Sequence, residues 1–190
     1  ILVDLGNGKN RLGGSCLAQV YSQLGDHCPD LDDADDLLGL FSAVQGLNEN
    51  GLLLAYHDRS DGGVYTTLVE MCLAGHVGVD IECADLISDA DDLLAWLFNE
   101  ELGVVLQVKS ADSAEVLRQL SSCGLAEQSR VIGTLNTDDQ IRFTIKGEAV
   151  LTDSRTQIHR TWAHTSFRLQ AMRDNANCAQ QEYDALLDAN

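Results

Sequence analysis

The segment His57-Asp-Arg-Ser-Asp-Gly-Gly63 carries four side chains that bind cations or phosphate: His57, Asp58, Ser60 and Asp61. Its two glycines give the backbone freedom to turn. Two carboxylates would repel a bare phosphate, so the segment favours a divalent cation held between carboxylate and phosphate. A simpler alternative needs only one of these residues, because Ser60 or Asp61 could merely cap a helix.

The residues on either side of this turn predict the elements that position it. The apolar run Leu52–Tyr56 is long enough for one buried strand. After Gly63 the apolar positions change to helical spacing, at Val64, Leu68, Met71, Cys72 and Gly75. The pattern therefore predicts a strand, a polar turn and a helix. Unpaired N–H groups at the start of such a helix, together with its dipole, favour an anion.

Two further turns combine glycine with polar side chains. Arg11-Leu-Gly-Gly-Ser15 precedes a helix predicted over Cys16–Leu24, with Ser15 as its N-cap. Asn99-Glu-Glu-Leu-Gly103 precedes a buried strand predicted over Val104–Val108. We expect the chemistry to lie at these two turns and at the His57–Gly63 turn, where polar groups and open backbone coincide. Either Glu100 or Glu101 can reach such a site, or both can be solvated loop acids.

The remaining pattern mixes strands and helices without strict alternation, which predicts an α+β fold with a mixed sheet flanked by helices. Residues 136–139 form a predicted hairpin-like turn between the last two strands. His76, between two glycines, is interpreted as a helix C-cap rather than a catalyst. The predicted strands are Ile1–Leu5, Val79–Glu82, Arg130–Leu135 and Gln140–Ile145, and the predicted helices are Asp32–Asn50, Asp91–Phe98 and Ala111–Cys123.

The chain is predicted to contain one domain over residues 1–153 and a helical linker over residues 154–190. After Asp153 the sequence is polar, with Ile158, Trp162, Leu169 and Met172 among the residues at helical spacing. Trp162 and Phe167 are interpreted as packing anchors, with a domain contact as the alternative. Because the chain opens in mid-strand, we expect it to be a piece of a longer protein.

The composition narrows the class of protein. With 190 residues, 45% of them hydrophobic, the chain is long enough for one substantial core. A net charge of −18 argues against binding nucleic acid, since contacts to phosphate need clustered Lys and Arg. No apolar run is long enough for a membrane span. The six cysteines form no C-x-x-C pair, which disfavours zinc and indicates reduced thiols in a cytoplasmic setting.

At the three glycine-containing turns the chain resembles the phosphoribosylformylglycinamidine synthase family. His57–Gly63 is similar to that family's H-D-x-S-D-G-G signature, and the likeness extends over nearly all of the chain. It is greatest for the second AIR-synthase-related C-terminal-type domain of the large, single-chain form. Further similar stretches are Asp4-Leu-Gly6, Leu12-Gly-Gly-Ser15, Ala74-Gly-His76, Leu97-Phe-Asn-Glu-Glu-Leu-Gly103 and Arg173-Asp-Asn175.

The resemblance implies an ATP- and glutamine-dependent ligase of purine biosynthesis as the parent protein. ATP activates an amide oxygen of formylglycinamide ribonucleotide, and ammonia from glutamine then displaces phosphate. This domain would contribute to an auxiliary site for Mg²⁺ and ATP or ADP. Asp58 would bind Mg²⁺, whereas Ser60, Gly62 and Gly63 would contact the nucleotide. The implied partners are preceding ATP-binding AIR-synthase-like domains and a C-terminal glutaminase domain, and the fragment alone would be inactive.

Two alternatives come from other classes of function. A stand-alone metal-dependent phosphate enzyme would use His57, Asp58 and Asp61, and would need another carboxylate on the same metal, from Glu100 or Glu101. An interaction domain would instead use its acidic surface to bind a partner.

Overall fold

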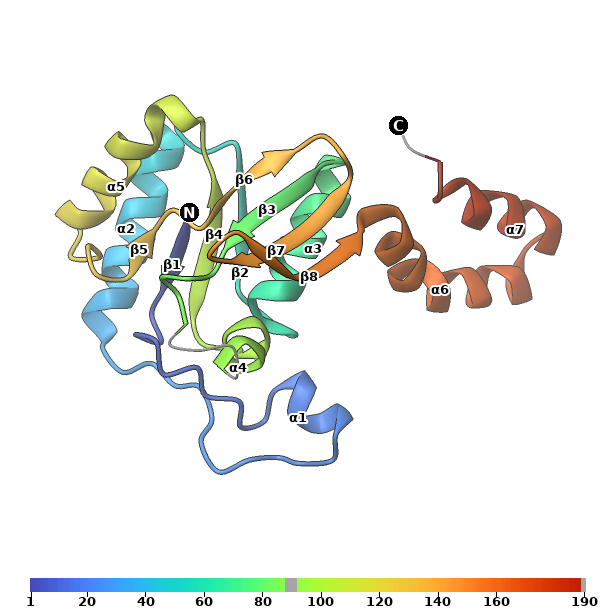
Figure 1. Ribbon diagram of the computed structural model, residues 1–190, viewed down its shortest axis with the longest axis horizontal. Helices are drawn as coiled ribbons and strands as arrows, with labels where there is room; N and C mark the ends of the chain where they lie inside the picture. The colour runs from blue at the N-terminus through green and yellow to red at the C-terminus, as the bar shows by residue number, and fades with distance from the viewer. Residues whose placement is uncertain (88–91, 189–190) are drawn as a thin grey trace. The chain divides into compact units, whose positions relative to one another are not determined.

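The computed structural model describes residues 1–87 and 92–188, which form two compact units. The first unit contains Ile1–Leu68 and Ala84–Ile132, and the second contains Val69–Cys83 and Gly133–Asn190. Each unit has one four-stranded sheet together with helices (Figure 1). This arrangement confirms the predicted α+β class, in which helices flank the sheets.

The sheet of the first unit has the strand order β2-β4-β1-β5, and all neighbouring strands are antiparallel. Two helices, α2 and α5, lie against this sheet (Figure 1). Asp33 caps α2 by accepting a hydrogen bond from Asp35 N, and two aspartates in the first turn suit the helix dipole. The elements are β1 (Leu2–Asp4), β2 (Ala55–Asp58), β4 (Gly103–Gln107), β5 (Ser129–Arg130), α2 (Ala34–Glu49) and α5 (Ser113–Ser122).

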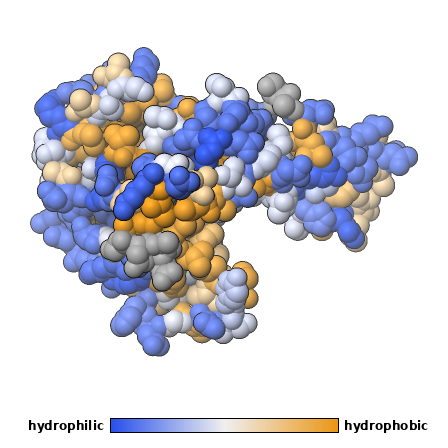
Figure 2. Space-filling model, in the orientation of Figure 1, coloured by the Kyte–Doolittle hydropathy of each residue, from blue (hydrophilic) through white to orange (hydrophobic). Residues whose placement is uncertain are grey.

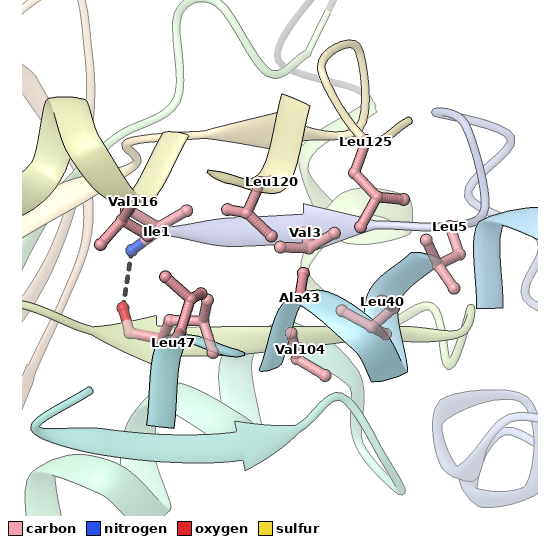
Figure 3. Close-up of a cluster of buried hydrophobic side chains, with 11 residues drawn as sticks. Ile1, Val3, Leu5, Leu40, Ala43, Leu47, Val104, Val116, Leu120 and Leu125 are labelled. Atoms are coloured by element: carbon pink, nitrogen blue, oxygen red, sulfur yellow. Dashed lines mark hydrogen bonds between the residues drawn. The ribbon is translucent and has the colours of Figure 1, made fainter. Parts of the chain in front are cut away.

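The core of the first unit lies between its sheet and these two helices (Figure 3). Ile1 N donates a hydrogen bond to Leu106 O at 2.8 Å, which continues the pairing of β1 with β4. Each fully buried Leu or Val contributes roughly 1.5–3 kcal/mol. The core residues are Ile1, Val3 and Leu5 beside β1, Leu40, Ala43 and Leu47 of α2, Val104 and Leu106 of β4, Val116 and Leu120 of α5, and Leu125.

The sheet of the second unit has the strand order β6-β3-β7-β8, and this order shows that the predicted hairpin is wrong. β3 lies between β6 and β7, antiparallel to β6 and parallel to β7. A Cβ at Gly78 of β3 would overlap Asn136 Oδ1 and Gln140 O, so a glycine lets this strand enter between the two others. The strands are β3 (Gly78–Glu82), β6 (Gly133–Asn136), β7 (Gln140–Ile145) and β8 (Glu148–Ser154).

The single strand predicted over Arg130–Leu135 is two strands in different sheets. β5 ends at Arg130 and pairs with β1, whereas β6 begins at Gly133 and pairs with β3. The chain passes from one sheet to the other at Ile132 and Gly133. Ile132 is buried, and Gly133 lies too close to Asp80 O to allow a Cβ. The apolar pattern continues across the break, so periodicity alone does not reveal it.

Two other predicted elements differ from the structure near the turns. The first, α1, covers only Cys16–Val20, because Ser22 adopts a left-handed conformation and Gln23 N bonds to Ala18 O. The second, the strand predicted over Leu52–Tyr56, begins only at Ala55, as edge strand β2. Leu52 and its neighbour Leu53 are half-buried and pack against the core as part of the preceding connection.

The other helices begin close to their predicted positions. α3 (Gly63–Gly75) follows the His57–Gly63 turn. α4 (Asp92–Phe98) matches its prediction except at Asp91, which lies outside the described residues. His76 after α3 has a positive φ of 51°, which confirms that it ends the helix. The remaining helical elements are η1 (Ser110–Asp112), α6 (Arg155–Arg173) and α7 (Ala176–Ala185).

The chain after β8 forms a helical hairpin, in which α7 packs back on α6 (Figure 1). Ser154 caps α6 by accepting a hydrogen bond from Gln157 N. In Figure 2, hydrophilic residues predominate on the visible face of this hairpin, with smaller hydrophobic patches among them. No described helix is long and apolar enough to cross a membrane.

Candidate functional site

Three glycine-containing turns meet in the first unit: Arg11–Ser15 (the first turn), His57–Gly63 (the central turn) and Asn99–Gly103 (the third turn). The side chain of Glu100, which belongs to the third turn, links the other two. Its Oε1 atom accepts one hydrogen bond from Cys16 N, at 2.8 Å, and another from Gly62 N, also at 2.8 Å. Cys16 follows the Arg11–Ser15 turn, and Gly62 belongs to the His57–Gly63 turn. We call this pair of hydrogen bonds the Glu100 bridge. It shows that the turns lie together, which the sequence did not predict.

The Arg59 side chain points into the protein and holds the central turn in place through buried hydrogen bonds. Its guanidinium donates to Glu101 O at 2.5 Å, to Leu102 O at 2.9 Å and to Asp4 Oδ1 at 2.5 Å. Arg59 N also donates to Gly103 O at 2.8 Å. The side chain is 1% exposed, so this cation is buried together with its three acceptors. The sequence did not predict the burial of Arg59, because an arginine between polar residues shows no apolar pattern.

Because Arg59 faces inward, the residues on either side of it face solvent. Asp58, Ser60 and Asp61 are all exposed. Tyr56 Oη donates to Asp58 Oδ1 at 2.5 Å, and this hydrogen bond orients the carboxylate. Desolvation, followed by that bond to Asp58, raises the pKa of the Tyr56 hydroxyl. Tyr56 therefore remains a donor to Asp58 at neutral pH.

The two glycines of the turn have different surroundings. Gly62 and Gly63 have φ values of 84° and 70°, a left-handed conformation that favours glycine. A Cβ at Gly63 would lie 2.6 Å from both Leu97 O and Asn99 O, so packing against the third turn requires this glycine. A Cβ at Gly62 would instead meet the Thr66 side chain. Contact of either backbone with a nucleotide stays a prediction.

Glu100 and Glu101 make different contacts. The sequence could not distinguish them, because they are adjacent and identical in type. Glu101 is fully buried and binds Arg11 through both carboxylate oxygens, at 2.7 Å each. This pairing raises the pKa of the Arg11 guanidinium. Arg11 also reaches Asp32 at 3.2 Å, which connects the chain just before α2 to the Arg11–Ser15 turn. Glu101 is thus a structural anion, and only Glu100 reaches the surface where the turns meet.

Asn99 holds the third turn in place. It is fully buried, and its side-chain amide donates to Ala95 O at 2.8 Å and to Trp96 O at 3.0 Å, at the end of α4. Its Oδ1 accepts from Glu101 N at 3.2 Å. The same amide reaches Asn10 Oδ1 at 3.1 Å, in the chain that leads to the first turn.

The chemistry of the donor atoms separates two possible cation positions. Among the described residues, Cys16, Asp61 and Glu100 form the one group of three whose ligand atoms lie within 4.8 Å of one another. Desolvation and the Glu100 carboxylate raise the pKa of the Cys16 thiol, so it stays protonated. A thiol is a poor ligand for Mg²⁺, and Glu100 Oε1 already accepts two N–H groups. The exposed carboxylate of Asp58 suits Mg²⁺ better, as a single ligand completed by phosphate and water oxygens.

The fold and the turns indicate a class of protein: an α+β domain with an exposed polar, glycine-containing loop. The buried Arg59 anchors this loop. The particular family follows from comparison with known families. Residues 1–146 match the family described as AIR synthase related protein, C-terminal domain. The chain belongs to this family.

Solved structures with the same fold include two kinds of protein. Phosphoribosylformylglycinamidine synthase II from Thermotoga maritima has 15% sequence identity and a TM-score of 0.58, with 66% of this chain and 22% of that chain covered. T. maritima PurL complexed with ATP gives 16% identity, the same coverage and a TM-score of 0.58. E. coli HypE, a hydrogenase maturation protein, gives 23% identity and a TM-score of 0.56, with 80% of this chain and 49% of that chain covered.

These likenesses establish the fold and also show a difference in length. The chain spans about a fifth of the synthase structures and about half of the hydrogenase maturation protein. The family match ends at residue 146, before β8 and the two terminal helices.

Proposed function

We propose that this chain forms one wall of an auxiliary Mg²⁺–nucleotide site in a phosphoribosylformylglycinamidine synthase of the large, single-chain form. In this site Asp58 binds Mg²⁺, Ser60 contacts a phosphate of ATP or ADP, and the backbone of Gly62 and Gly63 approaches the nucleotide. The Glu100 bridge is the observation that carries the proposal. It holds two loops together at the surface while leaving Asp58 and Ser60 exposed.

The residues fit this ligand chemically. A carboxylate is a hard oxygen ligand for Mg²⁺, which usually binds proteins through one or two carboxylates together with substrate phosphates. A bound Mg²⁺ neutralises phosphate charge and so removes the repulsion that Asp58 and Asp61 would exert on a bare nucleotide. The hydroxyl of Ser60 can donate to a phosphate oxygen.

The proposal extends to the parent protein. The resemblance at His57–Gly63 favours an ATP-dependent ligase of purine biosynthesis that takes its nitrogen from glutamine, in the cytoplasm. The preceding AIR-synthase-like domains would supply the other ligands of the nucleotide, and a glutaminase domain would follow residues 154–190. Similarity to a structure of PurL with ATP supports a nucleotide as the ligand of this fold.

A stand-alone metal-dependent phosphate enzyme is less well supported. That alternative needs Glu100 or Glu101 as a second carboxylate on the metal of Asp58. Glu101 is buried with Arg11, and Glu100 Oε1 holds two backbone N–H groups. Neither residue belongs with Asp58 to a described group of three clustered ligands. A phosphatase assay with Mg²⁺ tests this alternative directly, and we expect no activity.

The experiment for the auxiliary site is Asp58→Asn in the complete protein. We expect less bound ADP and Mg²⁺, and a lower melting temperature before any loss of turnover. A ligand that binds only the folded form stabilises it by RT ln(1 + [L]/Kd), about 2.7 kcal/mol at a hundredfold excess over Kd. Loss of the nucleotide removes this stabilisation. Bound nucleotide, melting temperature and turnover should be measured on one preparation.

Asp61→Asn provides the matched control, because it removes the same charge from an exposed residue of the same turn. The auxiliary-site proposal expects nucleotide content close to wild type for this variant, whereas the phosphate-enzyme alternative expects both aspartates to matter. An Asp58→Asn protein with full nucleotide content and normal melting, but with turnover reduced by orders of magnitude, would show a catalytic site and refute the proposal.

A further inference from the structure

The helix α6 has two faces, and α7 covers one of them. Phe167 stacks on Tyr183 with ring centroids 4.2 Å apart and planes at 10°. Tyr183 Oη donates to Arg160 O at 3.0 Å, and the Arg160 guanidinium lies 4.4 Å from the centre of the Tyr183 ring. Arg160 also pairs with Asp184 at 2.8 Å. Phe167 is therefore a packing anchor, as the sequence predicted.

Trp162 is not a packing anchor among the described residues, because 61% of it is exposed. Leu169 and Met172 are exposed by 63% and 84%. At about 100° per residue, Trp162 and Leu169 lie about 20° apart around the helix, and Phe167 lies about 140° from Trp162. We call Trp162, Leu169 and Met172 the α6 stripe. It lies on the side of α6 that faces away from α7.

The charge of α6 differs from that of the whole chain. The chain has a net charge of −18, yet residues 155–173 contain four of its 12 basic residues and no Asp or Glu. Arg155 and Arg160 are paired within the protein. Arg168 and Arg173 are exposed at the two edges of the α6 stripe. Arg173 pairs with its neighbour Asp174, whereas Arg168 makes no ion pair with any described residue.

We propose that the α6 stripe docks on a protein surface that is apolar at its centre and carries carboxylates at its rim. Trp and Arg are enriched among the residues that contribute most to binding at protein interfaces, and Met is enriched in interfaces generally. Carboxylates opposite Arg168 and Arg173 would complement the basic edges and set the orientation of the partner. This surface lies on the second unit and does not depend on the nucleotide site proposed above.

Two other partners fit the observations less well. Anionic membranes attract clusters of four to eight basic residues, whereas this protein carries a large negative charge that an anionic surface repels. A symmetric contact between two copies of the stripe would place Arg168, near the middle of the stripe along the helix, close to its own counterpart, and like charges at an interface are unfavourable.

The test uses two synthetic helical peptides of equal length, each with a leucine face and either glutamate or lysine on the flanks. Trp162 reports binding, because its indole is exposed whereas that of Trp96 is buried. We expect a saturable blue shift of fluorescence with the glutamate peptide, weakened by salt, and none with the lysine peptide. Trp162→Phe, which removes the reporter, should abolish the shift.

Arg168→Glu should weaken binding of the glutamate peptide about tenfold, which corresponds to about 1.4 kcal/mol. Arg118→Glu is the matched control, since Arg118 is an exposed arginine of α5 outside the stripe, and it should leave the affinity unchanged. The variants replace exposed side chains, and unchanged circular dichroism will establish that they are folded.

Four outcomes would overturn the proposal. They are equal binding of the two peptides, no binding of either peptide, and a Trp162 shift with phosphatidylserine vesicles but not with the glutamate peptide. The fourth is a dimer in sedimentation that Trp162→Ala dissociates, which would identify a second copy as the occupant.

Discussion

The two units use buried arginine for different purposes. In the first unit Arg59 binds Asp4 and two backbone carbonyls, and so fixes the loop that presents Asp58 and Ser60. In the second unit Arg155, whose side chain is 2% exposed, binds Asp139 at 2.6 and 2.9 Å. That pair attaches the start of α6 to the turn between β6 and β7. Buried cations thus support the loop of the proposed nucleotide site in one unit and a helix that leaves a sheet in the other.

The two buried arginines should therefore differ in how far the effects of their loss extend. The network around Arg59 joins residues from β1, the central turn and the third turn, so its loss should disturb the site and the fold together. The pair of Arg155 with Asp139 joins two neighbouring elements, and Asp139 is partly exposed. Its loss should affect the second unit without altering the loops of the first.

Arg59→Met should have the largest effect. The change removes the Arg59 guanidinium from Asp4 and from the carbonyls of Glu101 and Leu102, and breaking a buried pair costs about 3–5 kcal/mol. Urea denaturation measures the loss in the free energy of unfolding. Arg142→Met in the second unit is the control, because Arg142 and its partners Asp80 and Asp138 are partly exposed. An equal loss from both variants would show that the buried network of Arg59 contributes no more to stability than the partly exposed ion pairs of Arg142.

Gly63→Ala should come next, and Gly51→Ala is its control. Both residues have a positive φ, of 70° and 65°, which costs an alanine about 1–2 kcal/mol. Nothing lies within 4 Å of the Cβ position at Gly51, whereas the Cβ at Gly63 would overlap Leu97 O and Asn99 O. We therefore expect Gly63→Ala to lower the thermal midpoint clearly more. Equal midpoints would mean that residues 97–99 shift to accommodate the Cβ at Gly63 without loss of stability.

The pH dependence of stability should reveal the ion pair of the second unit. The Arg155 guanidinium lowers the pKa of Asp139 below its ordinary value of 3.8. Because the folded pKa is depressed, the stabilisation is present above pH 3.8 and is lost as the pH falls through the folded pKa. Asp139→Asn should thus melt lower than wild type near neutral pH, and the difference should shrink in acid.

Melting curves between about pH 6 and pH 2 measure this difference. Glu148→Gln removes an exposed carboxyl of β8 and controls for the change in net charge. A difference between wild type and Asp139→Asn that stays constant down to the lowest pH would show that the ion pair does not stabilise the fold.

The smallest effect should come from removing Arg173–Asn190. Among the described residues, α7 packs on α6 through Ala179 and Tyr183 and adds nothing to the core of the first unit. We expect the thermal midpoint of the core to stay nearly unchanged, as the sequence also predicted. Differential scanning calorimetry is the measurement. A large drop in the midpoint would assign this tail to the core and would contradict a linker over residues 154–190.

Local patterns in the sequence determined much of the fold. Ser15 caps α1, α3 begins at Gly63 directly after the polar turn, and β4 follows the third turn, all close to prediction. Cys72 lies on a buried face, as its helical spacing indicated. These features depend on residues only a few positions apart, whose side-chain spacing, capping and backbone freedom act within one element.

The tertiary structure alone determined which carboxylate links the turns and how the strands are ordered. Glu100 meets Cys16 N and Gly62 N across 84 and 38 positions, whereas its neighbour Glu101 meets Arg11 across 90 positions. β3 enters between β6 and β7 from more than 50 positions earlier in the chain. Such contacts depend on which distant groups burial brings together, and a pattern read along one segment carries no information about that choice.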